Sequence, residues 1–181
     1  MVRLDCRHPR EVRAAIRRLA VRGAPLIGIA AATLLRVGFA LAERGLVRAG
    51  TDVTGFGLLG HLASLCRASG VGAAIRGSAL PVLGREILEL IARDCYPGGS
   101  RQNMKTADSY TDWGRATPAL KALLCDAQTS GGLLLCVPPR QLAPVLKVLR
   151  QHRTACARVV GTLHRETDPL IRVIGETKAS R

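Results

Sequence analysis

Aromatic residues are scarce in this sequence of 181 residues: they make up 3 % of it, as one tryptophan, two tyrosines and two phenylalanines. A hydrophobic core must therefore be built mainly from leucine, valine, isoleucine and alanine, in a chain that is 48 % hydrophobic. The basic residues are not interleaved with aromatic side chains on which nucleic-acid bases could stack. We therefore do not expect a nucleic-acid partner.

Acidic residues are also few, because 13 Asp and Glu face 27 Lys and Arg, which gives a formal net charge of +14. Arginine supplies 23 of the basic residues and lysine supplies 4. Such an excess is typical of proteins that bind a polyanion or a phosphate-rich ligand. It also arises when a GC-rich genome encodes arginine in place of lysine, and the absence of a dense basic run leaves both interpretations open.

The six cysteines include no pair at the CxxC spacing that is typical of zinc sites. We recognise no secretory signal, so a disulfide framework is not expected either. Three cysteines lie in apolar runs, at Cys66, Cys125 and Cys136. This pattern predicts small buried hydrophobic residues in a reducing compartment, and hence a cytoplasmic protein.

One apolar stretch, residues 24–42, approaches the length of about 20 residues that a membrane span needs. Arg36 interrupts the stretch and alanine dominates it, so we predict a buried helix and no membrane partner. Another helix is predicted over residues 9–20, with Pro9 at its start. Together the two helices predict a helical hairpin as the N-terminal segment, residues 1–45.

Residues 46–175 alternate between helical and strand patterns, and residues 176–181 are predicted to form a frayed tail. Apolar spacing predicts helices near residues 57–68, 85–93, 118–124 and 141–151. Apolar runs predict strands within residues 71–77, 133–139, 156–163 and 170–175, the last two paired with each other. Glycine and proline predict a loop over residues 96–103. The alternation indicates an α/β or α+β domain in which helices cover a sheet.

Three segments share glycine, hydroxyl and amide residues: TDVTGFG (51–57), PGGSRQN (97–103) and DAQTSGG (126–132). Glycine lets backbone N–H groups approach an anion, and a helix N-terminus adds a favourable dipole, so these segments suit phosphate. The carboxylate of Asp52 suits Mg²⁺. An aspartate or threonine ahead of a helix is also the usual N-cap, so capping by Asp52 or Thr54 stays open as the alternative.

Histidine and the nucleophilic side chains give little further support for a complete active site. His61 lies on a helix face, where a surface or hydrogen-bonded histidine is commoner than a general base. No Ser-His-Asp or Cys-His arrangement can be read from the order of residues. A lone carboxylate without a partner acid, lysine or base is not a complete site, so no catalytic residue is assigned.

In their order and spacing, TDVTGFGLLGHL, PGGSRQN and LCDAQTSGGLLL resemble the C-terminal domain of selenophosphate synthetase (selenide, water dikinase), over about residues 36–175. The resemblance implies a mixed sheet with helices on one side, as in the C-terminal domain of aminoimidazole-ribonucleotide-synthetase-like enzymes. It implies a reaction of ATP, selenide and water that gives selenophosphate, AMP and phosphate, with Mg²⁺ bound by Asp52. The residues expected to contact the nucleotide phosphates are Thr51, Thr54, Gly55, Gly57, Gln128, Thr129, Ser130 and Gly131.

The sequence also departs from this family. It lacks the glycine-rich loop that carries a cysteine or selenocysteine and a nearby lysine, so Cys6 is not assigned as a nucleophile. Ala127 stands where the family usually has proline. We therefore expect the chain alone to be inactive and to need a separate N-terminal ATP-binding domain. The alternative is a non-catalytic stand-alone domain, or a remnant of a gene fusion, with at most weak binding of nucleotide phosphate.

Residues 1–35 resemble a different family. The segment EVRAAIRRLAVRGAPLIGIAAAT is similar to the N-terminal region of methylthioribose-1-phosphate isomerase. By this resemblance Arg22 would contact a sugar phosphate. The catalytic cysteine and aspartate of that isomerase have no counterpart here, so an isomerase function is disfavoured.

Overall fold

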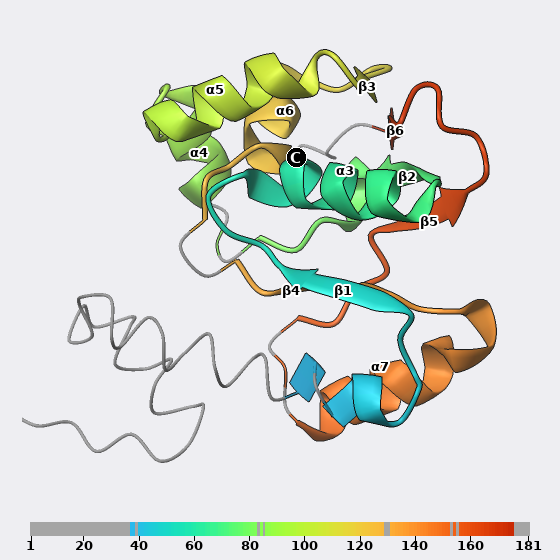
Figure 1. Cartoon of the computed structure of the whole chain (residues 1–181). Coiled ribbons are helices and arrows are strands. Elements are labelled where there is room, and N and C mark those ends of the chain that lie inside the picture. Colours follow the sequence, from blue (N-terminus) through green and yellow to red (C-terminus); the bar gives the residue numbers. More distant parts are fainter. Residues whose placement is uncertain are drawn as a thin grey trace, which may run out of the picture.

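The computed structural model describes residues 37–175, apart from residues 39, 83, 85, 129, 130, 153 and 155. It contains a four-stranded sheet and a two-stranded sheet with helices around them (Figure 1). The helices are α3 (Gly57–Ser69), α4 (Glu86–Ala92), α5 (Gly98–Ala107), α6 (Pro118–Leu124) and α7 (Leu142–Gln151), with 3-10 turns η1 (Gly77–Ala79) and η2 (Pro139–Gln141). The strands are β1 (Ala49–Asp52), β2 (Gly72–Arg76), β3 (Thr111–Asp112), β4 (Leu133–Cys136), β5 (Gly161–His164) and β6 (Ile171–Ile174).

The larger sheet is mixed and has the strand order β3-β6-β2-β5. Strand β2 is antiparallel to β5 and parallel to β6, and β3 is parallel to β6. The expected mixed α/β fold is confirmed, but the predicted pairing of the last two strands with each other is wrong. Strand β2 lies between them, and β5 approaches it so closely that a Cβ on Gly161 would overlap the carbonyl oxygen of Ala74.

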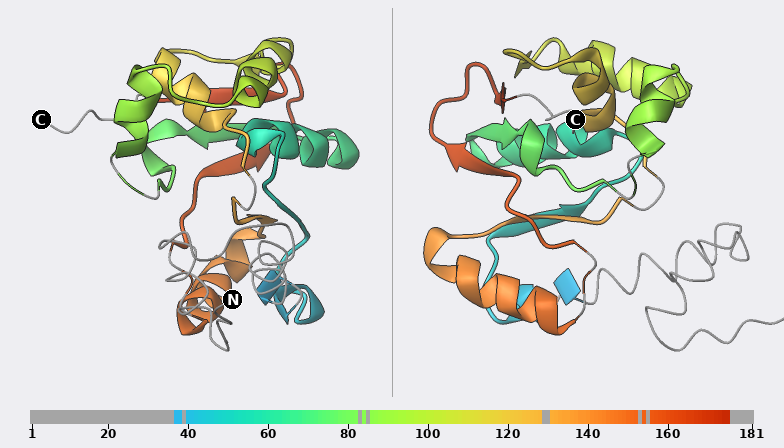
Figure 2. Two further views of the ribbon diagram at one scale, coloured as in Figure 1. Left: turned by 90° about the vertical axis from the view of Figure 1, so that its left-hand side faces the viewer. Right: turned by 180° about the vertical axis from the view of Figure 1, so that it is seen from behind.

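The smaller sheet is an antiparallel ladder of β1 and β4, which runs from Ala49 opposite Cys136 to Asp52 opposite Leu133. The sequence analysis did not predict β1, because its residues AGTD have weak strand propensity. The segment is extended because it pairs with the apolar strand β4. In Figures 1 and 2 the ladder lies between α7 and the rest of the molecule.

Two hydrophobic clusters lie on either side of this ladder. The larger cluster contains the buried residues Val53, Leu59, Leu62, Ala63, Cys66, Ala73, Ile75, Ala107, Leu120, Leu124, Cys125, Leu134, Ile171 and Val173. The smaller cluster contains the buried residues Leu41, Val145 and Val148, with partly buried neighbours that include Leu135. Adjacent residues Leu134 and Leu135 of β4 thus serve opposite clusters, as the alternation of side chains along a strand requires.

The predicted helices near residues 57–68, 85–93, 118–124 and 141–151 are confirmed as α3, α4, α6 and α7. Helix α3 ends at Gly70, which adopts the left-handed conformation with φ of 61°. Helix α6 begins with Pro118, and the side chain of Thr117 accepts a hydrogen bond from the N–H of Leu120. Local capping signals therefore set the ends of these helices.

The loop predicted over residues 96–103 is wrong for most of its length, because α5 begins at Gly98 and follows the extended N-cap residue Pro97. Two glycines at the start of a helix have poor intrinsic propensity. Contacts made by the fully buried Ser100 and the partly buried Asn103 compensate for this weakness.

Most of the predicted N-terminal hairpin lies outside the described residues, as does most of the apolar stretch 24–42. In the part of the chain that the structure describes, no helix has the length and apolar character needed to cross a membrane. The helical residues 37, 38 and 40–43 pack in the smaller cluster with α7 through Leu41. The boundary at residue 45 stays a prediction.

Candidate functional site

The glycine-rich segments 51–57 and 126–132 lie side by side in the structure. Beyond the end of the β1–β4 ladder, the N–H of Val53 donates to the carbonyl of Gly132 at 2.9 Å, and the N–H of Gly131 donates to the carbonyl of Val53 at 2.9 Å. The N–H of Gln128 donates to the carbonyl of Thr54 at 3.2 Å. Backbone pairing therefore continues from the ladder into both segments and holds them together.

Helix α5 brings the third segment, residues 97–103, to the same place. The side-chain amide of Asn103 donates to the carbonyl of Gly55 at 2.8 Å and to the carbonyl of Cys125 at 3.1 Å. The hydroxyl of Ser100 donates to the carboxylate of Asp126 at 3.0 Å and accepts from the N–H of Ala127 at 3.0 Å. All three sequence segments thus meet at one junction.

Gly57 explains why two loops can approach so closely at this junction. Its φ of 70° is in the left-handed region, and a Cβ on it would lie 2.7 Å from the carbonyl carbon of Cys125. A side chain at this position would be excluded both by backbone conformation and by contact. The glycine is therefore required for the packing of α3 against the end of α6.

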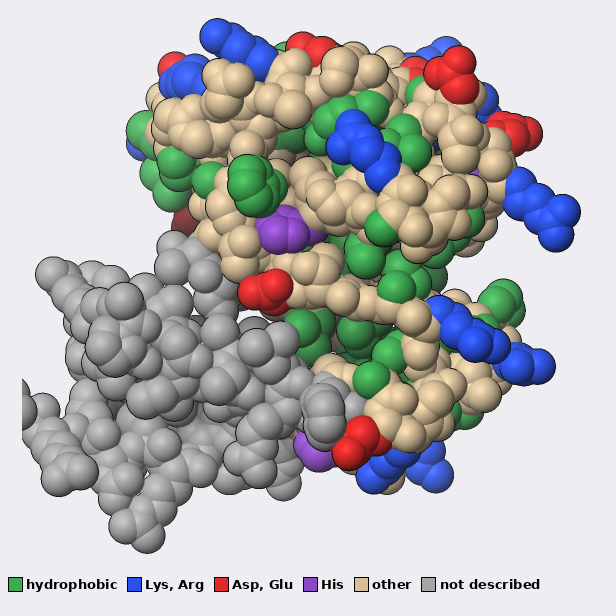
Figure 3. All heavy atoms as spheres, in the orientation of Figure 1, with side chains coloured by type: hydrophobic (Ala, Val, Ile, Leu, Met, Phe, Trp, Pro, Cys, Tyr) green, Lys and Arg blue, Asp and Glu red, His purple; other side chains and the backbone are tan. Residues whose placement is uncertain are grey.

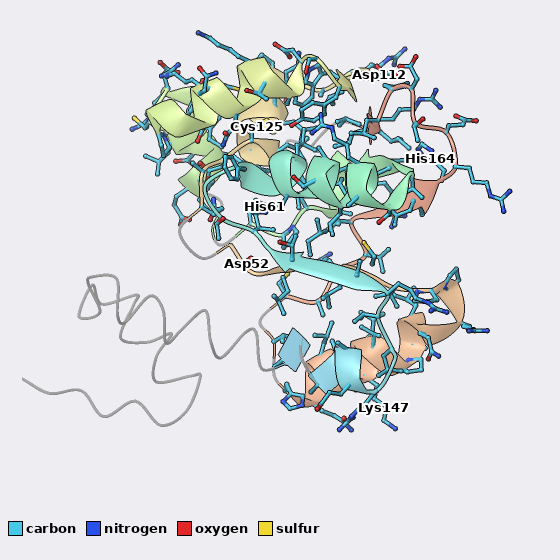
Figure 4. The ribbon with its side chains drawn as sticks, in the orientation of Figure 1. Asp52, His61, Asp112, Cys125, Lys147 and His164 are labelled. Carbon is cyan, nitrogen blue, oxygen red and sulfur yellow. The ribbon has the colours of Figure 1, made fainter. Side chains whose placement is uncertain are left out.

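Asp52 lies at the end of β1 and is exposed. Figure 4 shows it where β1 leads toward α3, on the same side of the molecule as His61. Its carboxylate forms no hydrogen bond or ion pair with any other described residue. The N-cap of α3 is Phe56, with no side-chain cap, so the alternative in which Asp52 or Thr54 caps this helix is wrong. No described residue therefore engages this carboxylate.

His61, on the first turns of α3, holds Thr54 in place. The Nε2 atom of His61 accepts the backbone N–H of Thr54 at 3.0 Å and lies 3.0 Å from its hydroxyl oxygen. Because Nε2 accepts, the neutral ring carries its proton on Nδ1. This confirms the expectation of a hydrogen-bonded histidine. It also means that the N–H of Thr54 is directed at His61 rather than at a ligand.

The remaining predicted contact residues take different places around the junction. The hydroxyl of Thr51 donates to the carbonyl of Asp52 at 3.0 Å. The side-chain amide of Gln128 donates to the carboxylate of Asp126. Gly55 and Gly131 are exposed. Thr129 and Ser130, like Arg22, lie outside the described residues, so their assignments stay predictions, and Cys6 lies outside them as well.

The carboxylates and histidines of this region do not form a complete metal centre by themselves. Among the described residues, no group of three or more His, Cys, Asp or Glu side chains is placed to hold a metal ion. On the face of the molecule shown in Figure 3, Lys and Arg side chains are spread out, mostly near the edges of the view. Metal binding by Asp52 therefore stays a prediction.

The cysteines near the junction are structural rather than reactive. Burial raises the pKa of the Cys125 thiol to about 12, with a smaller contribution from the charge of Asp108. Burial raises the pKa of the Cys66 thiol to about 11. A thiol must ionise to act as a nucleophile, so neither group is activated at neutral pH. The prediction of buried cysteines is confirmed for these two. Cys136 is only partly buried, and Cys95 and Cys156 are exposed.

Ser100 and Asn103 connect the loops, although neither has a role that the sequence predicts. The signal was present in PGGSRQN, where the two residues are three apart, the spacing that places side chains on one face of a helix. In a loop this spacing does not predict that two side chains lie together. In the helix α5 it does.

Residues 28–174 match the family model described as the C-terminal domain of AIR synthase related protein. The chain belongs to this family. The AIR synthase related C-terminal domain accounts for the mixed fold described above.

Similar proteins include three bacterial proteins named selenide, water dikinase. The one from Photorhabdus laumondii is 45 % identical over 129 residues, which are 69 % of this chain and 36 % of the relative. The one from Yersinia pestis is 50 % identical over 107 residues, 59 % of this chain and 30 % of the relative. The one from Colwellia psychrerythraea is 39 % identical over 142 residues, 78 % of this chain and 40 % of the relative. The chain thus spans well under half the length of these curated relatives.

Solved structures support the same fold. A structure of Thermotoga maritima PurL complexed with FGAR has a TM-score of 0.51 at 18 % identity, covering 84 % of this chain and 19 % of the other. Phosphoribosylformylglycinamidine synthase II from the same organism has a TM-score of 0.53 at 17 % identity, covering 87 % of this chain and 20 % of the other. At such low identity, the likeness concerns the fold alone.

Proposed function

We propose that this chain forms the C-terminal part of a selenide, water dikinase. In this reaction ATP, selenide and water give selenophosphate, AMP and phosphate, in the cytoplasm. The observation that carries the proposal is the junction of three segments, with the exposed carboxylate of Asp52 beside it. The names of the relatives favour this reaction over other ATP-dependent ones.

Mg²⁺ is the metal that fits Asp52. The side chain offers carboxylate oxygen, which Mg²⁺ prefers, and no other described side chain competes for it. Mg²⁺ commonly keeps several waters and takes further ligands from the phosphates of its substrate, so a single carboxylate from this chain is a sufficient contribution. When bound, the ion would neutralise charge on the transferred phosphoryl group.

The nucleotide phosphates would lie near the N-terminus of α3, against the segments 51–57 and 126–132. The N-cap of α3 has no side-chain hydrogen bond. The N–H of Gly57 donates to the carbonyl of Thr54 at 3.0 Å, so the anion would be bound by the other N–H groups at this end of the helix. Gly55 and Gly131 are exposed there and allow close approach. Thr54 acts in this proposal by shaping the loop, because its N–H is held by His61.

The relatives contain a long part that this chain does not match. The rest of the active site would come from a counterpart of that part. The chain spans 36 % of the relative from Photorhabdus laumondii. We propose that an N-terminal ATP-binding part, absent from this sequence, supplies the remaining metal ligands and the selenide site. A structure of Thermotoga maritima PurL complexed with ADP, with a TM-score of 0.52, is consistent with nucleotide use by this fold.

The second candidate is a non-catalytic domain that binds nucleotide phosphate weakly or not at all. The observation that favours it is the lack of three clustered metal-ligating side chains among the described residues. The two candidates differ in one respect: only the first predicts that activity returns when the missing part is supplied.

The test is complementation in trans. The chain is mixed with a separately produced N-terminal part of the Photorhabdus laumondii relative, together with ATP, selenide and Mg²⁺, and AMP formation is measured. We expect no AMP from either component alone and measurable AMP from the mixture. Absence of AMP from the mixture, with both components folded, would favour the non-catalytic candidate.

The role of Asp52 is tested with Asp52→Asn in the same mixture. We expect AMP formation to fall by about 100-fold or more, since a charged ligand to the metal becomes a neutral amide. The matched control is Glu89→Gln, which removes an exposed carboxylate from α4. Equal activity of Asp52→Asn and the wild-type chain would exclude Asp52 as a metal ligand.

A further inference from the structure

We propose that Asn103 is a positioning residue for the phosphate site, an inference that rests on the proposed function. One atom of its side chain, Nδ2, donates to the carbonyl of Gly55 at 2.8 Å and to the carbonyl of Cys125 at 3.1 Å. Gly55 lies in the segment 51–57, and Cys125 directly precedes the segment 126–132. Both segments are proposed to contact phosphate. Asn103 therefore couples the two loops from a third element, α5.

The coupling fixes the orientation of one peptide group in particular. The carbonyl of Gly55 and the N–H of Phe56 belong to the same peptide unit, and in a trans peptide the two groups point in opposite directions. Among the described residues, the only cis peptide bond is Asp168–Pro169. Because the carbonyl of Gly55 points toward Asn103, the N–H of Phe56 points away from α5.

The N–H of Phe56 is left for a ligand by this arrangement. Within the described part of the chain, this group has no hydrogen-bond acceptor, whereas the N–H of Thr54, two residues earlier, is held by His61. Phe56 is also the N-cap of α3, and its side chain is 69 % exposed. Asn103 thus presents a backbone donor at the positive end of a helix, where an anionic oxygen is favoured.

The neighbouring contacts make Asn103 the residue that decides this orientation. The backbone bonds of the junction fix Val53, Thr54, Gly131 and Gln128, but none of them involves the carbonyl of Gly55. His61 holds Thr54 from the other side. Removal of the Asn103 amide would leave the peptide between Gly55 and Phe56 held only by the turn in which the N–H of Gly57 donates to the carbonyl of Thr54 at 3.0 Å, so its orientation would be less restricted.

The experiment follows the backbone amide of Phe56 by NMR while the full chain is titrated with Mg·ATP. In the wild-type chain we expect its chemical shift to change with saturation. In Asn103→Ala we expect the apparent dissociation constant to rise about tenfold, which corresponds to the loss of about one hydrogen bond from the Phe56 N–H to the ligand. Asn103→Asp, which keeps the shape but removes the donor, should behave in the same way.

Two further variants separate positioning from general stability. Asn103→Gln keeps an amide donor and should recover part of the affinity. Gln102→Ala, which removes an exposed amide from the neighbouring position on α5, should bind as the wild-type chain does. If Asn103→Ala lowers thermal stability but binds Mg·ATP with unchanged affinity, the residue is merely structural and the inference is wrong.

The failure of this inference can be told from the failure of the proposed function. If the wild-type chain responds to Mg·ATP and Asn103→Ala responds equally, only the role of Asn103 is excluded. If the wild-type chain shows no response, alone or with the N-terminal part added, the proposed function fails and the role of Asn103 at a ligand site fails with it. In that case, faster hydrogen exchange of the Gln128 amide in Asn103→Ala would still reveal a structural connection.

Discussion

The two hydrophobic clusters differ in both size and role. Counting only the residues that the structure describes, the larger cluster packs α3, α5 and α6 with β2 and β6 and contains fourteen buried residues, whereas the smaller one contains three, around α7. Residues adjoining the proposed site, Val53 and Cys125, belong to the larger cluster. The comparison shows that the loops of the site extend from well-packed core positions, so a rigid base supports exposed backbone.

The sharpest way to test this difference is to make the same substitution in each cluster. Leu120 and Leu41 are both fully buried. We expect Leu120→Ala to lower the free energy of unfolding by about 4 kcal/mol and Leu41→Ala by about 2 kcal/mol, because the smaller cluster can collapse around the lost volume. Urea unfolding monitored by the fluorescence of Trp113 measures both. Equal losses would mean that the clusters are equally packed.

A smaller effect is expected at the polar junction beside the larger cluster. Ser100→Ala removes the donor to the Asp126 carboxylate and the acceptor of the Ala127 N–H, at a fully buried position. We expect a loss of about 2 kcal/mol in the free energy of unfolding. The control is Ser109→Ala at an exposed position, with an expected change below about 0.5 kcal/mol. Similar small changes for both variants would show that the junction contributes little to stability.

The smallest effect is a pH dependence that originates in the larger cluster. Burial raises the pKa of Cys125 from 9.0 to about 12, so the unfolded chain releases this proton at lower pH than the folded chain. Stability is therefore lost as pH rises above 9, and the loss is complete near pH 12. Between pH 9 and pH 10 this group should remove about 1 kcal/mol of unfolding free energy.

Thermal unfolding of Cys125→Ala across this range checks the prediction. The substitution should make the decline in stability between pH 9 and pH 10 less steep. Cys95→Ala, at an exposed position, should leave the decline as it is in the wild-type chain. A decline that is unchanged in Cys125→Ala would assign the pH dependence to other groups.

Much of the fold could be predicted because its signals are local. Helix α6 begins at Pro118 after Thr117, and α3 ends at Gly70, all of which act within a few residues. Strand β1 and helix α5 could not be predicted in this way. Strand β1 is extended through its pairing with β4, and α5 starts with two glycines that only tertiary contacts make acceptable.

The candidate site shows the same division. The composition of three segments, with Asp52 in the first, indicated phosphate and magnesium before any arrangement was known. Their meeting point, and the roles of Ser100 and Asn103 in it, could not be inferred, because the contacts join residues far apart in the chain. The spacing of these two residues became informative only once α5 was known to be a helix.

By itself, the sequence determined which segments are apolar and where most helices begin and end, since these properties depend on neighbouring residues. The tertiary structure alone decided that β2 separates the last two strands and that Thr54 faces His61 rather than a ligand. It also left the carboxylate of Asp52 exposed without a cap role. Long-range hydrogen bonds and close backbone packing have no local signature, because their partners are brought together only by the folded chain.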